Sequence, residues 1–236
     1  MFSPVVSEFW DRTMAGTVVA ENRRFRLTLN PHLPSEQTVG ILTTEEFTRV
    51  CLLPEVAAAA GLDRPPQHLE PAQVRTRLLA AGVRLGGPDH LHYFLQAEAE
   101  QLSGEPEAPG VRELTAGDEG LFAAFTAGCS EEDLDEAYVE LDHWLVVGAL
   151  SQGVLVAAAS AYAWQGSALA DVGVITYPQH RRQGHARAVV RAISRRLLQR
   201  GYQPQYRCFH TNAASAAVAV SAGMGRFGTW DTLPED

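Results

Sequence analysis

The chain contains no lysine, so each of its 19 basic residues is an arginine. With 28 acidic residues, its formal net charge is −9, and it lacks the basic footprint of a general nucleic-acid-binding protein. It also has no GxxxxGK[ST] phosphate loop. The charge balance therefore argues against nucleic acid as a partner, but it leaves room for a small anionic ligand held by a local group of arginines.

Cysteine is scarce. The three cysteines, Cys51, Cys129 and Cys208, are far apart and form no CxxC pair. Neither a disulfide framework nor a zinc site is expected, and a reducing compartment fits this pattern. His90 and His92 make an H-x-H pair, but no third ligand stands at a convincing spacing, so a structural role is expected and no metal is predicted.

Long apolar stretches are absent too. No run of about 18 apolar residues exists, so no spanning helix and no membrane partner are expected. The first 16 residues lack a basic region followed by an apolar one, so no signal peptide is expected either. These absences predict a cytoplasmic protein of ordinary globular composition, with 46% hydrophobic residues.

The segment SGEPEAPG, Ser103 to Gly110, has the composition of a linker. We therefore expect two domains, residues 1–104 and 105–236. The first is predicted to be a small α+β unit of unknown role, because no chemical signature stands out in it. Its expected strands are residues 17–21, 24–30, 38–43 and 90–96, and its expected helices are residues 44–61 and 71–82.

The second part has a more regular order of elements. Ser130 and Asp133 form a capping pattern at the start of one expected helix. Apolar residues recur at helical spacing after residue 185, and Arg187, Arg191 and Arg195 follow each other at four-residue spacing on another face. Strands are expected at 111–114, 143–150, 153–164, 168–176, 204–210 and 226–233, and helices at 117–128, 130–141, 185–201 and 212–223.

The stretch YPQHRRQGHARAVV, Tyr177 to Val190, joins a strand to a long helix. The first N–H groups of a helix have no partner within it, and the helix dipole adds positive charge there. Gly184 lets a ligand approach the backbone, and Arg181, Arg182 and Arg187 add charge at the same point. With only one glycine in the turn, it is not a GxGxxG motif. The stretch predicts a cradle for a phosphate or pyrophosphate.

Residues 181–186, RRQGHA, resemble the R/Q-x-x-G-x-G/A signature of the GNAT superfamily of N-acetyltransferases. Pro178 follows the preceding strand, Asn212 and Ser215 give an N-x-x-S helix start, and Gly223 ends that helix, as in the family. The resemblance covers about residues 111–230. It implies an α/β (α+β) fold with a mixed, mostly antiparallel central sheet flanked by helices. For the first half, a degenerate copy of the same fold is one alternative.

The resemblance also implies acetyl-CoA as cosubstrate. Backbone N–H groups from Arg182 to Arg187 would hold its pyrophosphate, and a splayed strand would offer its backbone to the pantetheine arm. A backbone N–H of Val174 or Ile175 would contact the oxyanion. The residues expected to bind the cosubstrate are Val174, Ile175, Thr176, Arg181, Arg182, Gln183, Gly184, His185, Ala186, Arg187, Asn212 and Ser215.

Catalysis needs a base for the amine and a proton for the leaving thiolate. Asp171 is the candidate base. The alternative is that Asp171 is an exposed strand-end or turn aspartate with no catalytic role. Where the family frequently has a tyrosine as general acid, this chain has Ala219. Tyr162, Tyr177 and His210 are the possible substitutes, and each also suits a packing or surface role.

An acidic run follows residue 130, and it suits either the mouth of a site for a cationic amine or a solvated helix face. Its members are Glu131, Glu132, Asp133, Asp135, Glu136, Glu140 and Asp142.

The expected function is an acetyl-CoA-dependent N-acetyltransferase in which an amine attacks the thioester directly within a ternary complex. No cysteine is placed to form a covalent acetyl-enzyme. Two alternatives remain: a non-catalytic CoA-binding regulatory or interaction module, and a structural α/β protein that does not bind CoA. The sequence leaves the acceptor and the oligomeric state open.

Overall fold

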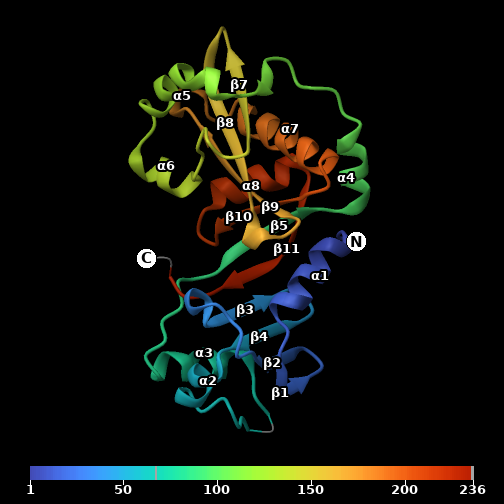
Figure 1. Cartoon of the computed structure of the whole chain (residues 1–236), viewed down its shortest axis with the longest axis vertical. Helices are drawn as coiled ribbons and strands as arrows, with labels where there is room; N and C mark the ends of the chain where they lie inside the picture. The colour runs from blue at the N-terminus through green and yellow to red at the C-terminus, as the bar shows by residue number, and fades with distance from the viewer. Residues whose placement is uncertain (67, 235–236) are drawn as a thin grey trace. The chain divides into compact units, whose positions relative to one another are not determined.

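The computed structural model describes residues 1–66 and 68–234 (Figure 1). The chain folds into two compact units, each built from separate stretches of sequence. The larger unit contains Met1–Val6, His92–Arg207 and Ala213–Arg226, and the smaller contains Ser7–Leu91, Cys208–Asn212 and the chain from Phe227 onward. The division after residue 104 stays a prediction.

The smaller unit is an α+β structure. Its strands follow the order β1-β2-β4-β3-β11, and apolar residues of β2, β3, β4, α2 and α3 form its core. Its elements are β1 (Thr17–Asn22), β2 (Phe25–Leu29), η1 (Ser35–Gln37), β3 (Val39–Thr43), β4 (Thr48–Leu52), α2 (Pro54–Ala59) and α3 (Pro71–Ala80), with parts of α1 (Pro4–Thr13), β5 (Asp89–Phe94) and β11 (Met224–Asp231).

The single long helix expected at residues 44–61 is wrong. The chain forms strand β4 there and then the short helix α2. β4 pairs in parallel with β2 and antiparallel with β3, and β-branched Thr48 and Val50 suit such an inner strand. Pro54 begins α2, where the missing N–H costs nothing. Two helices, α1 and α4 (Gln96–Ser103), were not predicted.

The larger unit has a mixed sheet with the strand order β11-β5-β10-β9-β8-β7-β6. The pairs β6–β7, β7–β8 and β8–β9 are antiparallel, and β9–β10 is parallel. The expected fold, a mostly antiparallel sheet flanked by helices, is confirmed. The further strands are β6 (Val111–Glu113), β7 (Leu145–Ser151), β8 (Val154–Ala163), β9 (Leu169–Thr176) and β10 (Gln203–Phe209).

Helices cover both faces of this sheet (Figure 1). On one face, α5 (Glu119–Thr126) and α6 (Glu131–Ala137) pack on Ala158 and Ile175. On the other, α7 (His185–Gln199) buries Val189, Val190, Ile193 and Leu197, which is the apolar face that the sequence predicts. The remaining elements are η2 (Ala116–Asp118), η3 (Trp164–Gly166), η4 (Pro178–His180) and α8 (Ala213–Ala222).

The end of α6 lies directly against β9. The capping pattern is present, since Ser130 accepts from the Asp133 N–H and begins the helix. The helix ends at Tyr138, which has a left-handed backbone with φ 45°. A β-carbon on Gly173 of β9 would lie 2.1 Å from the Ala137 carbonyl oxygen. Only glycine allows this close approach.

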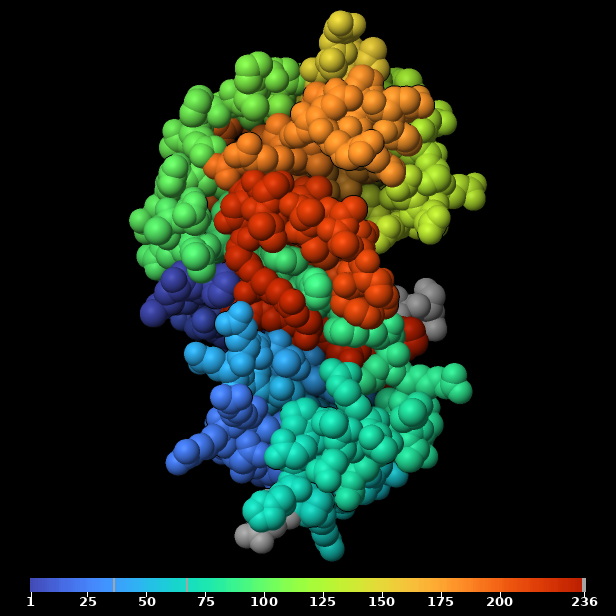
Figure 2. Space-filling view, turned by 180° about the vertical axis from the view of Figure 1, so that it is seen from behind, coloured from blue at the N-terminus to red at the C-terminus, as the bar shows by residue number. Residues whose placement is uncertain are grey.

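The expected linker is held against α7 by ion pairs. We call residues 103–107 the strap. Glu105 pairs with Arg191, and Glu107 pairs with Arg195 and Arg196, each at 2.6 Å. Arg195 also donates to the Glu105 carbonyl at 2.5 Å. Arg191 and Arg195, two of the arginines at four-residue spacing, thus find their countercharges 86 and 88 positions earlier in the chain. In the space-filling view, the surface of α7 (orange) adjoins that of this region (green) (Figure 2).

No helix in the described part of the chain is long and apolar enough to cross a membrane.

Replacing Gly173 by alanine should destabilise the fold by about 1–3 kcal/mol, because the new methyl group would overlap a backbone oxygen. Gly120→Ala in α5 is the control: a β-carbon there meets no other atom within 4 Å, and the change should stabilise by about 0.5–1 kcal/mol. Urea unfolding measures both. Equal stability of Gly173→Ala and wild type would contradict the close approach.

The strap should make stability depend on pH. Burial raises the pKa of Glu107, but hydrogen bonds and charge from Arg196 and Arg195 outweigh this effect and hold the pKa below its usual 4.5. A lowered folded-state pKa gives stability above the unfolded pKa, and this is lost as pH falls through the folded pKa.

Glu107→Gln should therefore cost about 0.5–1 kcal/mol at neutral pH. The difference in unfolding free energy between this variant and wild type should shrink as the pH drops below 4.5. Chemical denaturation across this range is the measurement. A difference that does not change with pH would disprove the electrostatic origin.

Candidate functional site

The turn before α7 presents an open backbone. Gly184 is the N-cap residue with φ 85°, and Arg182 has φ 61°. A β-carbon on Gly184 would meet no atom within 4 Å. Within the described residues, the backbone N–H groups of residues 182–187 donate no hydrogen bond. Several free donors at the positive end of a 15-residue helix fit a phosphate group.

The arginines around this turn differ in their surroundings. Arg181 pairs with Asp133 of α6 at 2.8 Å and donates to the Thr176 carbonyl at 3.3 Å. A hydrogen bond from Ser130 and the charge of Arg181 lower the pKa of Asp133 below its usual value, despite partial burial. Arg187 is exposed and makes no ion pair in the described chain. The side chain of Arg181 therefore ties the turn to α6, while that of Arg187 is available.

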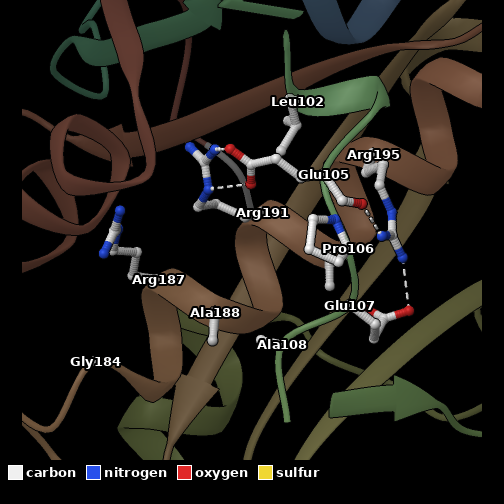
Figure 3. Close-up of a pocket in the computed structure, with 11 residues that line it drawn as sticks. Leu102, Glu105, Pro106, Glu107, Ala108, Gly184, Arg187, Ala188, Arg191 and Arg195 are labelled. Atoms are coloured by element: carbon white, nitrogen blue, oxygen red, sulfur yellow. Dashed lines mark hydrogen bonds and ion pairs between the residues drawn. The ribbon is translucent and has the colours of Figure 1, made fainter.

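A pocket of about 220 Å³ extends from this turn along α7 (Figure 3). The strap forms one wall, and Arg187, Arg191 and Arg195 line the other. Figure 3 shows Arg191 joined to Glu105 and Arg195 to the strap, with Arg187 unattached on the same helix. Leu102, Pro106, Ala108, Ala188 and Ala192 add apolar surface.

Strand β9 separates from β10 partway along its length. Leu169 pairs with Gln203, and the pairing ends two residues later, where Asp171 pairs with Gln205. β9 nevertheless continues to Thr176. On its other side, β9 stays paired with β8 through Thr176. Residues 172–176 therefore have one backbone edge without a register partner in β10. An unpaired edge of this kind can take an extended ligand as an added strand.

Asp171 lies at the last paired position and is buried, with 6% of its surface exposed. Its Oδ2 accepts from the Tyr162 hydroxyl and from Arg207 Nε, and its Oδ1 accepts from Gln205, each at 3.0 Å. The Arg207 guanidinium lies 4.0 Å from the ring centroid of Trp164. Burial, and then the charge of Asp171, raises the pKa of Tyr162 far above its usual value, so this phenol stays neutral.

Three rings cluster on the α6 face of the same strands. Tyr138, His143 and Tyr162 have ring centroids 5.0–5.4 Å apart. His143 Nδ1 lies 2.7 Å from Ser160 Oγ, and its Nε2 lies 3.7 Å from a Glu140 oxygen. Ser160 and Tyr162 pair across the ladder with Gly173 and Asp171, so all four residues share one face.

The remaining candidates have different surroundings. Ser215 on α8 lies 2.8 Å from the Tyr206 hydroxyl, and Asn212 directly precedes α8. Ala219 is fully buried. Tyr177 packs in the apolar cluster with Phe125, which suits a packing role. His210 belongs to the smaller unit and lies on Phe209, with centroids 4.5 Å apart.

Sequence reasoning missed several residues of this site. Gln205 and Arg207 alternate with buried Tyr206 and Cys208, and this alternation of polar and less polar residues was an available signal. Glu105 and Glu107 were read only as linker residues. His143 and Tyr138 carried no local signal, because their contacts depend on strand register and on the left-handed end of α6.

His90 and His92 were weighed above as metal ligands. Among the described residues, no group of three His, Cys, Asp or Glu side chains is arranged to hold a metal ion.

Comparison with known proteins supplies the family. A family model described as GNAT acetyltransferase matches residues 108–233. No curated protein matches the chain. Among solved structures, a putative GNAT-family acetyltransferase from Novosphingobium aromaticivorans is similar, with 20% identity, a TM-score of 0.47, and coverage of 65% of this chain and 67% of that one.

Two further solved structures are similar at this level. An acetyltransferase from the GNAT family of Colwellia psychrerythraea has 17% identity, a TM-score of 0.48, and coverage of 64% of this chain and 57% of that one. The ribosomal-protein-S18-alanine N-acetyltransferase of Escherichia coli has 20% identity, a TM-score of 0.38, and coverage of 52% of this chain and 92% of that one. The assignment rests on the family model, which spans more than half of the chain: this protein belongs to the GNAT acetyltransferase family.

Proposed function

We propose that the protein is an acetyl-CoA-dependent N-acetyltransferase that transfers the acetyl group directly to an amine. The observation that carries this proposal is the open backbone before α7, which lies at the end of the same strand, β9, that separates from β10. One end of an extended anionic thioester would bind at the helix start, and its arm would follow the unpaired edge of β9.

In this proposal the N–H groups from Arg182 to Arg187 hold the pyrophosphate, together with Gln183, Gly184, His185 and Ala186 of the same turn. Val174, Ile175 and Thr176 offer backbone groups to the arm. The Thr176 hydroxyl is buried and makes no hydrogen bond among the described residues, so it can accept or donate one to a ligand. Arg181 acts indirectly, by fixing the turn to Asp133. Asn212 and Ser215 are proposed to lie near the far end of the cosubstrate.

The chemistry requires a neutral amine. Its nitrogen attacks the thioester carbonyl, a backbone N–H of Val174 or Ile175 stabilises the oxyanion, and the C–S bond breaks to release the CoA thiolate. We propose Asp171 as the base. Three protein donors occupy most of its acceptor positions, so the proton would reach it through water or through the free position on Oδ1.

The proton on the leaving thiolate has no obvious protein source. The family tyrosine position is the buried Ala219, and the Tyr162 hydroxyl already donates to Asp171. We propose that solvent protonates the thiolate. The acceptor is proposed to be a cationic amine, because α6, which carries much of the acidic run, ends against Gly173 on the face of β9 that also carries Asp171. Glu140 of the following loop lies beside His143.

Ala219 favours one rival, a CoA-binding module without turnover. The two functions differ in thiol release. A transferase consumes acetyl-CoA faster when a suitable amine from a mixed panel is added, and a binding module does not.

Acetyl-CoA should raise the melting temperature of the protein saturably. Ligand at about 100 times its dissociation constant stabilises a fold by about 2.7 kcal/mol. Adenosine should have no such effect, since it lacks the pyrophosphate and the pantetheine arm. An unchanged melting temperature with acetyl-CoA at millimolar concentration would refute the proposal.

Gly184→Glu should abolish the rise in melting temperature with acetyl-CoA, because it places a side chain and a negative charge where the pyrophosphate would bind. Gly201→Glu is the matched control. Gly201 follows the other end of α7, has the same φ of 85°, and is equally open. The control has the same backbone strain but should bind acetyl-CoA normally. Retained binding in a folded Gly184→Glu variant would refute the cradle.

Tyr162 should remain protonated where ordinary tyrosines titrate, near pH 10. The phenolate absorbance that develops as the pH rises through 10 should therefore be the same in wild type and in Tyr162→Phe. Asp171→Asn removes the nearby negative charge and should lower the pKa of Tyr162. If Tyr162→Phe removes one tyrosine's share of the absorbance change near pH 10, the burial and the Asp171 contact of Tyr162 are wrong.

A further inference from the structure

The proposed reaction removes two protons from the acceptor nitrogen. An alkylamine enters as an ammonium at neutral pH and must lose one proton before it can attack. The nitrogen loses a second proton when the tetrahedral intermediate becomes an amide. Asp171 can take one of them, but three protein donors already fill most of its acceptor positions, so it is poorly suited to take both. The site therefore needs a second proton acceptor.

His143 presents a ring nitrogen that is free to act as a base. Ser160 donates its hydroxyl proton to the Tyr138 carbonyl oxygen at 3.5 Å, and that oxygen can only accept. Ser160 Oγ is therefore the acceptor for His143 Nδ1, 2.7 Å away, and we assign the imidazole proton to Nδ1. The lone pair of neutral His143 is then on Nε2, which makes no hydrogen bond among the described residues. An oriented imidazole with an unoccupied basic nitrogen is what a general base requires.

The surroundings of Nε2 suit a proton in transit. A Glu140 oxygen lies 3.7 Å from Nε2, and its negative charge favours the imidazolium that forms on proton uptake. The side chain of His143 is 10% exposed and that of Glu140 is 52% exposed, so the proton can pass on to solvent at this point. The half-exposed Tyr138 ring lies 5.0 Å from the imidazole and offers an aromatic surface to an ammonium. An incoming ammonium would meet a base, a carboxylate and an aromatic ring together.

Tyr162 separates His143 from Asp171. The centroid of the Tyr162 ring lies 5.3 Å from that of the imidazole, and the Tyr162 hydroxyl donates to Asp171 at 3.0 Å. On its far side, Asp171 is paired with Arg207. The two proton acceptors thus lie near each other with a neutral phenol between them, and each can hold a proton of its own.

His143 also lies next to the open edge of β9. It is bonded to Ser160 of β8, which pairs across the ladder with Gly173. Gly173 lies two residues beyond the last position paired with β10, and it directly precedes Val174, whose N–H is a proposed oxyanion donor. An acceptor that reaches this part of β9 from the α6 face would pass the imidazole.

We propose that His143 is a second catalytic base, which takes the first proton from the acceptor ammonium. An N–H bond breaks, its electron pair stays on nitrogen, and the proton moves to His143 Nε2 and then past Glu140 to water. The neutral nitrogen attacks the thioester carbon, the C–S bond breaks, and the thiolate takes a proton from solvent. The second N–H proton goes to Asp171. The inference rests on the proposed function and deepens it, because it assigns the acceptor to alkylamines that are protonated at neutral pH.

The pH dependence of His143→Gln tests this role. Thiol release from acetyl-CoA is measured with the full chain and a panel of primary alkylamines that includes putrescine, tyramine and lysine, and kcat/KM is followed for the most active amine. At about pH 7 the variant should be about 100-fold slower, a typical contribution of a general base. Its kcat/KM should then rise about tenfold per pH unit, because the neutral amine itself becomes more abundant, while wild type changes little. By about pH 9 the two should differ by about fivefold or less.

A matched control is His32→Gln, the same substitution at an exposed histidine of the smaller unit, which should keep the wild-type profile. A loss in His143→Gln that is equally large at neutral and alkaline pH, or no loss at all, would overturn the inference. Amine-stimulated thiol release by wild type would still support the proposed function in that case. If no amine of the panel stimulates thiol release in wild type, the proposed function fails as well.

Glu140→Gln is a second variant that does not depend on the folding of His143→Gln, because the Glu140 side chain is largely exposed. The kcat/KM of wild type should fall at acid pH as the imidazole of His143 is protonated. Without the carboxylate, protonation is less favourable, so this acid limb should move to lower pH, by about half a unit for an exposed pair. An acid limb that stays in place would show that the group that titrates is not beside Glu140, and it would overturn the assignment of His143.

Discussion

One buried carboxylate determines where the sheet of the larger unit opens. Asp171 on β9 accepts hydrogen bonds from Tyr162 on β8 and from Gln205 and Arg207 on β10. These bonds join three strands at the last register pair of β9 and β10, and the two strands separate just beyond it. Removing one partner of such a buried ion pair typically costs about 3–5 kcal/mol, because the other charge stays buried without compensation. The open edge of β9 therefore begins at a rigid point.

The second fixed region lies at the start of α7. Gly184 and Arg182 adopt positive φ, Arg181 is tied to α6, and the strap is paired with the arginine row of α7. The turn can keep its N–H groups free because its neighbours are held by other contacts. The end of β9 at Thr176 and the open helix start at Gly184 are eight residues apart along the chain. Preorganised donors of this kind need little rearrangement when an anion binds.

The sequence predicted the parts of this site that are local. A helix start, its glycine and its arginines are contiguous, and their physical meaning does not depend on the rest of the fold. Most strands and helices of the larger unit were also predictable, because their apolar periods are clear. The single helix expected at residues 44–61 failed because pairing with β2 and β3 decides the structure of Thr48–Leu52.

Contacts across the sequence could not be predicted in the same way. Asp171 was identified as a strand-end carboxylate, but its partner Arg207 is 36 positions away, and the pairing follows only from the register of β9 and β10. The strap was read as a linker for the same reason. Its glutamates are 86 or more positions from the arginines that bind them, and a segment rich in proline and glycine gives no sign of this.

The arginine row of α7 has a chemical consequence if the protein binds a reactive thioester as proposed. A lysine amine near a bound thioester can itself be acylated, which would remove its charge. Guanidinium groups stay protonated at all ordinary pH values and are poor nucleophiles. Because every cationic side chain of the sequence is an arginine or a histidine, no side-chain amine is present for acetyl-CoA to modify. The ion pairs of the strap are therefore chemically inert toward the thioester that the turn before α7 is proposed to bind.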